Sequence, residues 1–143
     1  MKKSAYILLL ILIAGCQLSS SQNVNMKTVK QTELTNINIK NYNFLDCMYQ
    51  DSYFPTFLVD KCKNILLNLC SEIESKKPNS LKELYGLTHS STNQINALQN
   101  EFFENNSEIE TGARECFGAN FEFISKTYGF DADTEELIAT RDW

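Results

Sequence analysis

The feature that most constrains the fold is a run of apolar residues at helical spacing between Pro55 and Pro78. The residues on this stripe recur at steps of three and four: Leu58, Cys62, Ile65, Leu66, Leu69 and Ile73. Such spacing places them on one face of an α-helix. Proline suits the first turn of a helix and cannot continue one, so Pro55 and Pro78 bracket the element. The pattern predicts a long helix with one face in a core.

Helical periodicity continues through the rest of the chain from Tyr42 onward. It predicts further helices over residues 44–49, 80–103, 107–129 and 133–138. Within 80–103, Gly86 and Thr88–Thr92 are the points at which one helix could divide into two. No segment in this region alternates convincingly with the period of two that strands show. The sequence therefore predicts an all-α fold, with residues 42–143 forming one small bundle of four to five helices.

Capping signals mark the ends of these helices. Three predicted helices begin at a residue whose side-chain oxygen can accept a backbone N–H: Ser80, Ser107 and Asp133. Glu83 and Glu110, three residues after the two serines, complete capping boxes. Gly129 suits the left-handed position just after a helix.

The first fifteen residues have the pattern of a secretory signal peptide. Lys2 and Lys3 precede an unbroken apolar run over residues 7–13, and Ala14 and Gly15 are small. The alternative is an uncleaved membrane anchor, but the run is short for a bilayer core of about 30 Å. We expect residues 1–15 to be removed from the mature protein.

The residue at the predicted cleavage point is Cys16. Residues 13–16, Ile-Ala-Gly-Cys, resemble the bacterial lipobox, in which the cysteine takes a diacylglyceryl group and its new amine is acylated, commonly with palmitate. Two or more acyl chains anchor a protein stably. We therefore expect a lipoprotein held in the cell envelope. Gln17, where inner-membrane lipoproteins have Asp, implies the periplasmic face of the outer membrane if the cell is Gram-negative.

Residues 16–41 differ in composition from the rest. They are rich in Ser, Asn, Gln, Thr and Lys and contain no aromatic residue. Such a segment buries too little apolar surface to offset the entropy of ordering it. The sequence predicts a flexible tether between Cys16 and the helical domain.

The charge balance excludes one class of partner. The precursor has 13 basic and 18 acidic residues, and loss of Lys2 and Lys3 leaves 11 against 18. A chain this acidic lacks the basic patch that nucleic acids require. The acidic surface could attract a basic protein, although maintenance of solubility explains the charge more simply.

Four cysteines remain besides the predicted lipid site: Cys47, Cys62, Cys70 and Cys116. Cys62 and Cys70 lie eight residues apart on one predicted helix, about 12 Å along its axis, which is too far for a disulfide. Two complete pairings remain: Cys47–Cys62 with Cys70–Cys116, and Cys47–Cys70 with Cys62–Cys116. An exported protein meets an oxidising compartment, so such bonds would persist.

Other roles for the cysteines are disfavoured. Cysteine is also a common small core residue, and most of these lie on or near apolar stripes. A zinc site is disfavoured because there is no CxxC spacing and His89 is the only histidine. A catalytic thiol would need a basic neighbour. No metal or other cofactor is expected.

Four segments resemble a family of small bacterial proteins known only as domain of unknown function 5713. They are MYQDSYFPTFLVDK (48–61), LYGLTH (84–89), EFFENNSEIETGARECF (101–117) and YGFDADTEELIATRDW (128–143). The resemblance covers most of the predicted domain and brings no known activity. Most relatives look cytosolic and lack the lipobox, so export would set this chain apart.

Several polar groups invite catalytic interpretations that structural roles explain better. The clustered carboxylates are Asp46, Asp51, Asp60, Glu101, Glu104, Glu108 and Glu110. Acid–base chemistry uses such pairs, but carboxylates near helix N-termini or facing water are commoner. Asp131, Asp133 and Glu135 lack the glycine and distant glutamate of a calcium loop. Tyr85 and His89, four residues apart, fit a stacking contact.

Three functions are compatible with these features. The first is a structural or accessory lipoprotein of the envelope. The second is an inhibitor or immunity protein that guards the envelope against a secreted toxin or hydrolase, with a binding patch around Tyr49, Asp51, Tyr53 and Phe54. The third, an enzyme, is disfavoured because the chain contains no established catalytic or nucleotide-binding motif.

Overall fold

The computed structural model describes residues 28–143, and its fold is all-α, as predicted. The elements in chain order are the 3-10 helix η1 (Gln31–Glu33), α1 (Ile37–Lys40), α2 (Asp46–Tyr49), α3 (Thr56–Lys76), α4 (Leu81–Asn96), α5 (Gln99–Glu104), α6 (Thr111–Thr127) and α7 (Thr134–Leu137). The described part of the chain contains no β-strand. The predicted signal peptide, Cys16 and residues 17–27 lie outside the described residues.

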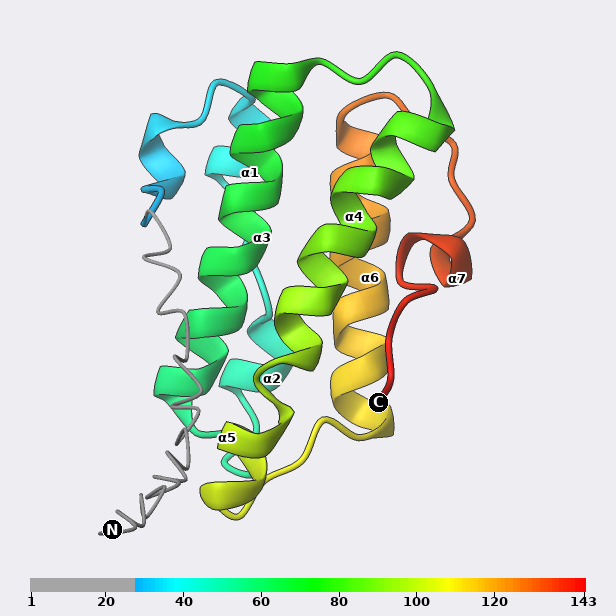
Figure 1. Cartoon of the computed structure of the whole chain (residues 1–143). Helices are drawn as coiled ribbons and strands as arrows, with labels where there is room; N and C mark the ends of the chain where they lie inside the picture. Colours follow the sequence, from blue (N-terminus) through cyan, green and yellow to red (C-terminus); the bar gives the residue numbers. More distant parts are fainter. Residues whose placement is uncertain (1–27) are drawn as a thin grey trace, which may run out of the picture.

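Three long helices, α3, α4 and α6, form the body of the bundle (Figure 1). α3 packs along α4, and α6 packs against α7, which also contacts α4. The short α2 contacts both α3 and α6 and therefore bridges two of the long helices. α5 lies at the lower end of the view, where α3 begins (Figure 1).

The predicted apolar stripe of α3 is confirmed. All six of its residues are buried, together with Val59, Leu67 and Cys70. The buried face is wide because α3 contacts α4 and α2. Lys77 ends the helix in the left-handed conformation, with φ of 51°, and Pro78 prevents its continuation.

The predicted helix over 80–103 is two helices, and the break falls later than expected. It lies at Ala97 and Leu98, between α4 and α5, rather than at Gly86 or Thr88–Thr92. The Thr92 hydroxyl donates to the Thr88 carbonyl at 3.0 Å, so this polar stretch is satisfied within the helix. A Cβ at Gly86 would meet nothing within 4 Å, so this glycine marks no close approach of another segment.

The predicted cap at Ser80 is confirmed, although Glu83 reaches back one residue further than in a standard capping box, and the second predicted box is wrong. Ser80 Oγ accepts from the Glu83 N–H at 3.3 Å, while the Glu83 carboxylate accepts from the Asn79 N–H at 2.8 Å. α6 begins at Thr111, not after Ser107. Ser107 is buried and its hydroxyl has no partner. Its N–H donates to the Phe102 carbonyl at 3.0 Å, which holds the loop against α5 instead.

The ends of α6 and α7 follow the predicted chemistry. Gly129 has φ of 87° and its N–H donates to the Lys126 carbonyl, while the Phe130 N–H donates to the Ser125 carbonyl. These two bonds make a Schellman motif, which requires the left-handed glycine. Asp133 caps α7 by accepting from the Glu136 N–H at 3.0 Å.

The folded domain begins before Tyr42, so the predicted extent of the tether is wrong for residues 28–41. Val29, Leu34 and Ile39 are buried in the main core, and Asn36 caps α1. The segment has few apolar residues, but these three are spaced so that each reaches the core. Between Leu34 and Ile39, the Thr35 and Asn36 N–H groups donate to the Glu74 carboxylate of α3. The part of the predicted tether over 16–27 lies outside the described residues.

Within residues 28–143, no helix combines the length and apolarity needed to cross a membrane.

Candidate functional site

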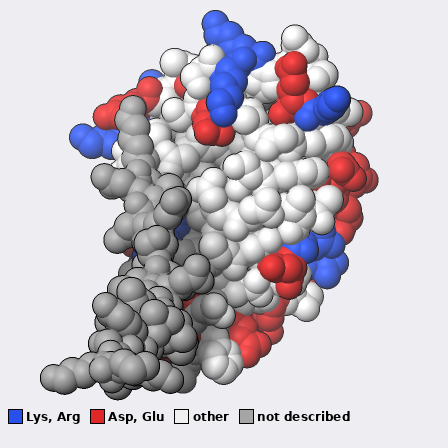
Figure 2. All heavy atoms as spheres, viewed as in Figure 1, with Lys and Arg blue, Asp and Glu red and all other residues white. Residues whose placement is uncertain are grey.

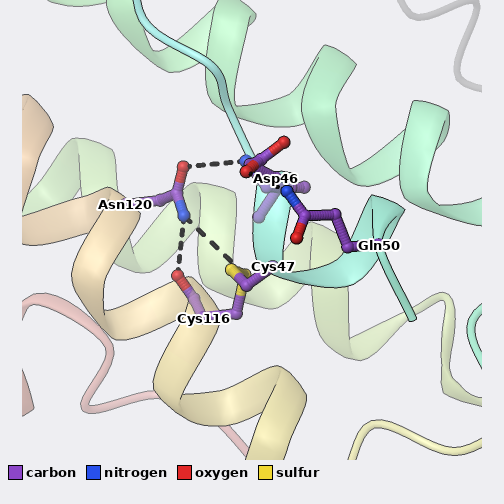
Figure 3. Close-up of a disulfide and its surroundings, with 6 residues drawn as sticks. Asp46, Cys47, Gln50, Cys116 and Asn120 are labelled. Atoms are coloured by element: carbon purple, nitrogen blue, oxygen red, sulfur yellow. Dashed lines mark hydrogen bonds between the residues drawn. A yellow bond between two sulfur atoms is a disulfide. The ribbon is translucent and has the colours of Figure 1, made fainter.

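A disulfide joins Cys47 of α2 to Cys116 of α6, across 69 residues of sequence (Figure 3). The two Cα atoms are 6.2 Å apart, within the range that disulfides favour. Cys116 is buried and Cys47 lies at the surface. The bond fixes the short α2 against the first half of α6, at the end of the bundle where α3 also begins (Figure 1).

The side chain of Asn120 supports the same junction. Its Oδ1 accepts from the Leu45 N–H at 3.1 Å, and its Nδ2 donates to the Cys116 carbonyl at 2.7 Å (Figure 3). Leu45 is buried and has φ of 56°, a conformation that is costly for a residue with a side chain. Asn120 thus satisfies the backbone N–H of the strained residue that precedes α2.

Neither of the two predicted disulfide pairings forms. Cys62 and Cys70 do not pair with each other, as expected from their spacing, but they also pair with nothing else. Both are buried, and burial raises the pKa of each thiol to about 12. Because the thiolate is the reactive form, these two cysteines act as core residues. The prediction from cysteine spacing failed because it compared only pairings that use all four cysteines. In the structure, α3 buries both of its thiols in the core, and neither forms a disulfide.

The predicted binding patch divides between surface and core. Phe54 is only 6% exposed, so its place on a surface patch is wrong. Its N–H donates to the Asp51 carbonyl, and the resulting turn directs the ring inward. Tyr53 is 40% exposed, and its N–H donates to the Asp51 carboxylate at 2.9 Å. Tyr49 is half-buried, and its hydroxyl donates to Asp60 at 2.6 Å. Burial is the larger cause, and this hydrogen bond the smaller one, of a raised pKa of Tyr49.

Two exposed aromatic residues at the same end were not predicted from the sequence. Phe57 is 47% exposed at the start of α3, and Phe103 is 71% exposed on α5. An ion pair between Lys61 and Glu101 joins these helices, and the Lys61 ammonium lies 5.9 Å from the centre of the Phe57 ring. We call Tyr53, Phe57 and Phe103 the aromatic end. The sequence signal for Phe57 and Phe103 was weak, because each is an aromatic residue beside an apolar stripe but off its period.

Negative charge gathers around the aromatic end. Residues 46–61 and 99–115 carry eight Asp and Glu residues, against the basic Lys61 and Arg114. The described residues as a whole carry 18 acidic and ten basic residues, so these two segments hold most of the excess. Figure 2 shows the contrast: the centre of the face over α3 and α4 has few charged groups, and carboxylates appear along its lower margin.

The Tyr85–His89 pair has a structural place. The two rings are nearly parallel, with centroids 6.0 Å apart. His89 Nε2 lies 2.7 Å from the Glu136 carbonyl, which can only accept, so Nε2 carries a proton. The Thr140 hydroxyl donates to the His89 carbonyl at 3.2 Å. These bonds join α4 to α7 and the C-terminal segment.

Another cluster of polar contacts lies at the opposite end of the bundle, around Glu74 of α3. Its carboxylate accepts from the N–H groups of Thr35 and Asn36 and from the Tyr128 hydroxyl, at 2.8 to 3.0 Å. Burial alone would raise the Glu74 pKa, but these hydrogen bonds together hold it below its usual value. A hollow of about 410 Å³ borders this cluster. Because the carboxylate is fully engaged, its evident role is to hold the segment before α1.

The remaining carboxylates do not converge on a metal-binding group. Asp133 is used as the cap of α7, and Glu135 pairs with Arg141 at 2.5 Å. Within residues 28–143, no group of three or more His, Cys, Asp or Glu residues has the arrangement that would hold a metal ion.

The fold and its contacts define a class: a small all-α domain with one disulfide between a short helix and a long one. The profile of the Family of unknown function (DUF5713) matches residues 38–143, and the chain belongs to this family. This confirms the resemblance seen in its motifs. No curated protein and no solved structure gives a significant match. The family match begins within α1, in agreement with a domain that starts before Tyr42.

Proposed function

We propose that this chain is an accessory protein of the bacterial cell envelope, attached to its membrane through acyl chains on Cys16. The observation that carries the proposal is the disulfide between Cys47 and Cys116. Disulfides persist in oxidising compartments and are rare in the cytosol. The signal peptide and lipobox predicted from residues 1–16 and the disulfide in the domain are independent features, and export would account for both.

The chemistry of the domain favours a role in binding rather than catalysis. The free thiols are buried in a protonated form, and the ring of His89 is occupied by the Glu136 carbonyl. Glu74 is engaged by three neighbouring residues. The aromatic end, by contrast, presents three rings whose residues are 40%, 47% and 71% exposed. An accessory protein would use such a surface to contact another envelope component.

A second candidate, an inhibitor or immunity protein for a secreted toxin or hydrolase, is favoured by the same aromatic end and its carboxylates. Aromatic side chains on a rigid acidic surface suit tight binding of a basic protein. The two candidates differ in the effect of deleting the gene. Loss of an accessory protein would weaken the envelope in every culture, whereas loss of an immunity protein would harm cells only when the toxin is present.

The membrane attachment is tested by labelling cells with radioactive palmitate. We expect label in the wild-type chain and none in a Cys16→Ser variant, which should also run as the larger, uncleaved precursor. Alkylation of cell extracts before reduction should leave Cys47 and Cys116 unmodified. An unlabelled wild-type chain in the cytosol, with both cysteines alkylated, would overturn the proposal.

A further inference from the structure

We propose that the aromatic end is a docking surface for a basic protein, which it contacts through Phe103, Phe57 and Tyr53. This inference rests on the proposed function, because it assumes that the protein meets its partner in the cell envelope. It gives the surface and the chemistry of the partner, which the proposed function leaves open.

The first argument is the exposure of the three aromatic rings at one end of the bundle. Within residues 28–143, Phe103 is the most exposed of the large apolar residues, and Phe57 and Tyr53 lie at the start of α3 and in the loop before it. A single exposed apolar residue is ordinary. Three aromatic rings at one end, surrounded by polar groups, have the composition of an interface centre with its rim.

The second argument is the rigidity of the surface. The disulfide fixes α2 to α6, the Tyr49 hydroxyl holds Asp60, and the Lys61–Glu101 pair joins α3 to α5. These links connect the segments that carry the aromatic end and its carboxylates. A surface held in place before binding loses little conformational entropy when it meets a partner, so more of the contact energy appears as affinity.

The third argument is charge, which selects the partner. Eight carboxylates and two basic residues in the segments 46–61 and 99–115 give this end a strong negative potential. Anionic lipids and nucleic acids would be repelled, and a second copy of this chain would present the same charge. A protein surface rich in Arg and Lys is complementary: it would neutralise the rim, and its guanidinium groups would stack on the exposed rings.

The surface can be tested in cells with the full, lipidated chain. The photoreactive residue p-benzoylphenylalanine is placed at position 103 in one strain and at position 37 in another. Ile37 is the matched control because it is 64% exposed but lies on α1, toward the other end of the bundle (Figure 1). We expect ultraviolet light to give a crosslink from position 103 to a protein with a basic isoelectric point, identified by mass spectrometry, and none to this protein from position 37.

The identified protein is then purified and its affinity measured. Phe103→Ala and Phe57→Ala should each weaken binding at least about tenfold, as loss of an interface anchor does. Ile37→Ala should leave affinity unchanged, and raising the ionic strength should weaken binding. All three substituted residues are at the surface, so thermal unfolding should remain close to that of the wild type.

Each other outcome overturns the proposal. Crosslinks from position 103 to lipid, to a second copy of this chain or to an acidic protein would assign the surface to another occupant. Equal crosslinking from both positions, or none from position 103, would remove it as a specific surface. The palmitate experiment tests the membrane attachment independently. A labelled chain that lacks the expected crosslink would reject only the docking surface. An unlabelled chain that gives the crosslink would reject only the membrane attachment.

Discussion

At the residue scale, two buried or half-buried polar side chains hold parts of the backbone that apolar contacts alone would leave loose. Asn120 accepts from Leu45, the strained residue before α2, and Glu74 accepts from Thr35 and Asn36 before α1. Loss of the Asn120 bond would leave the buried Leu45 N–H unpaired, which is costly. The Glu74 bonds are exposed or half-buried, and the charge of the carboxylate strengthens them. Each acts between residues far apart in sequence and therefore fixes a segment on the body of the bundle.

Replacing Glu74 by Gln tests this role. The hydrogen bonds lower the Glu74 pKa in the folded state, so they stabilise the domain fully above the unfolded value of about 4.3. That stabilisation disappears as the pH falls through the lower folded value. We expect Glu74→Gln to lower the free energy of unfolding by about 1–3 kcal/mol at neutral pH, and by progressively less below about pH 4.

The matched control is Glu72→Gln on the same helix. Glu72 lies at the surface and pairs only with Lys76, at 3.4 Å. Exposed pairs of this type contribute little, so its effect should stay below about 0.5 kcal/mol. Urea denaturation across a pH series measures both variants. Equal effects of the two substitutions at neutral pH would show that the Glu74 bonds do not hold the segment.

Residue roles near an apolar stripe are the least predictable from sequence. Tyr53 and Phe54 are neighbours of similar character, yet the turn at Asp51 leaves one ring exposed and the other buried. Phe103 is exposed, although the adjacent Phe102 is fully buried. Sequence periodicity identifies which face of a helix is apolar, but it does not say how far the neighbouring elements extend to cover the residues beside it.

At the scale of elements, the long helices and the short α2 and α7 were predictable, whereas η1, α1 and the point at which α5 separates from α4 were not. Strong periodicity predicted α3, and the caps at Ser80, Gly129 and Asp133 correctly marked the start of α4, the end of α6 and the start of α7. The signal at Ser107 was misleading because tertiary packing draws that loop into the core before α6 begins. The disulfide partner of Cys47 was also beyond sequence reasoning, because it depends on which long helix α2 lies against.

The contribution of the disulfide is testable at this scale. It closes a loop of about seventy residues, and a crosslink of this span stabilises a domain by about 2–5 kcal/mol. We expect reductant to lower the urea midpoint of the wild type by the corresponding amount. Cys47→Ser should show the same low midpoint without reductant and no further response to it.

The control for this experiment is Cys62→Ala. It removes a free thiol from the core and lowers stability through a small cavity, yet its midpoint should still fall when reductant is added. If reductant leaves the wild-type midpoint unchanged, the Cys47–Cys116 bond does not stabilise the domain, and its support for export is weakened.

At the scale of the whole molecule, the ordered residues before Tyr42 alter the geometry of the proposed attachment. Thr28 borders the same surface hollow as Lys61 and Asn64 of α3. The twelve Cα–Cα steps from Cys16 to Thr28 span no more than about 43 Å even when fully extended. Under the proposed lipidation, the bundle therefore stays within that distance of the bilayer, closer than a tether extending to residue 41 would allow.

The domain boundary itself gives the last prediction. Removal of residues 28–41 takes Val29, Leu34 and Ile39 out of the core and leaves Glu74 without its two backbone donors. Burial of three aliphatic side chains acts together with the hydrogen bonds of Gln31 and Glu74 to hold the segment on the bundle. We therefore expect a chain that begins at Tyr42 to lose about 2–4 kcal/mol of stability, the part of this burial that the entropy of ordering the segment does not cancel. A chain that begins at Thr28 should unfold at the same urea concentration as one that begins at Gln17. If the chain that begins at Tyr42 also unfolds at this urea concentration, residues 28–41 belong to the tether and the domain begins at Tyr42, as composition alone predicts.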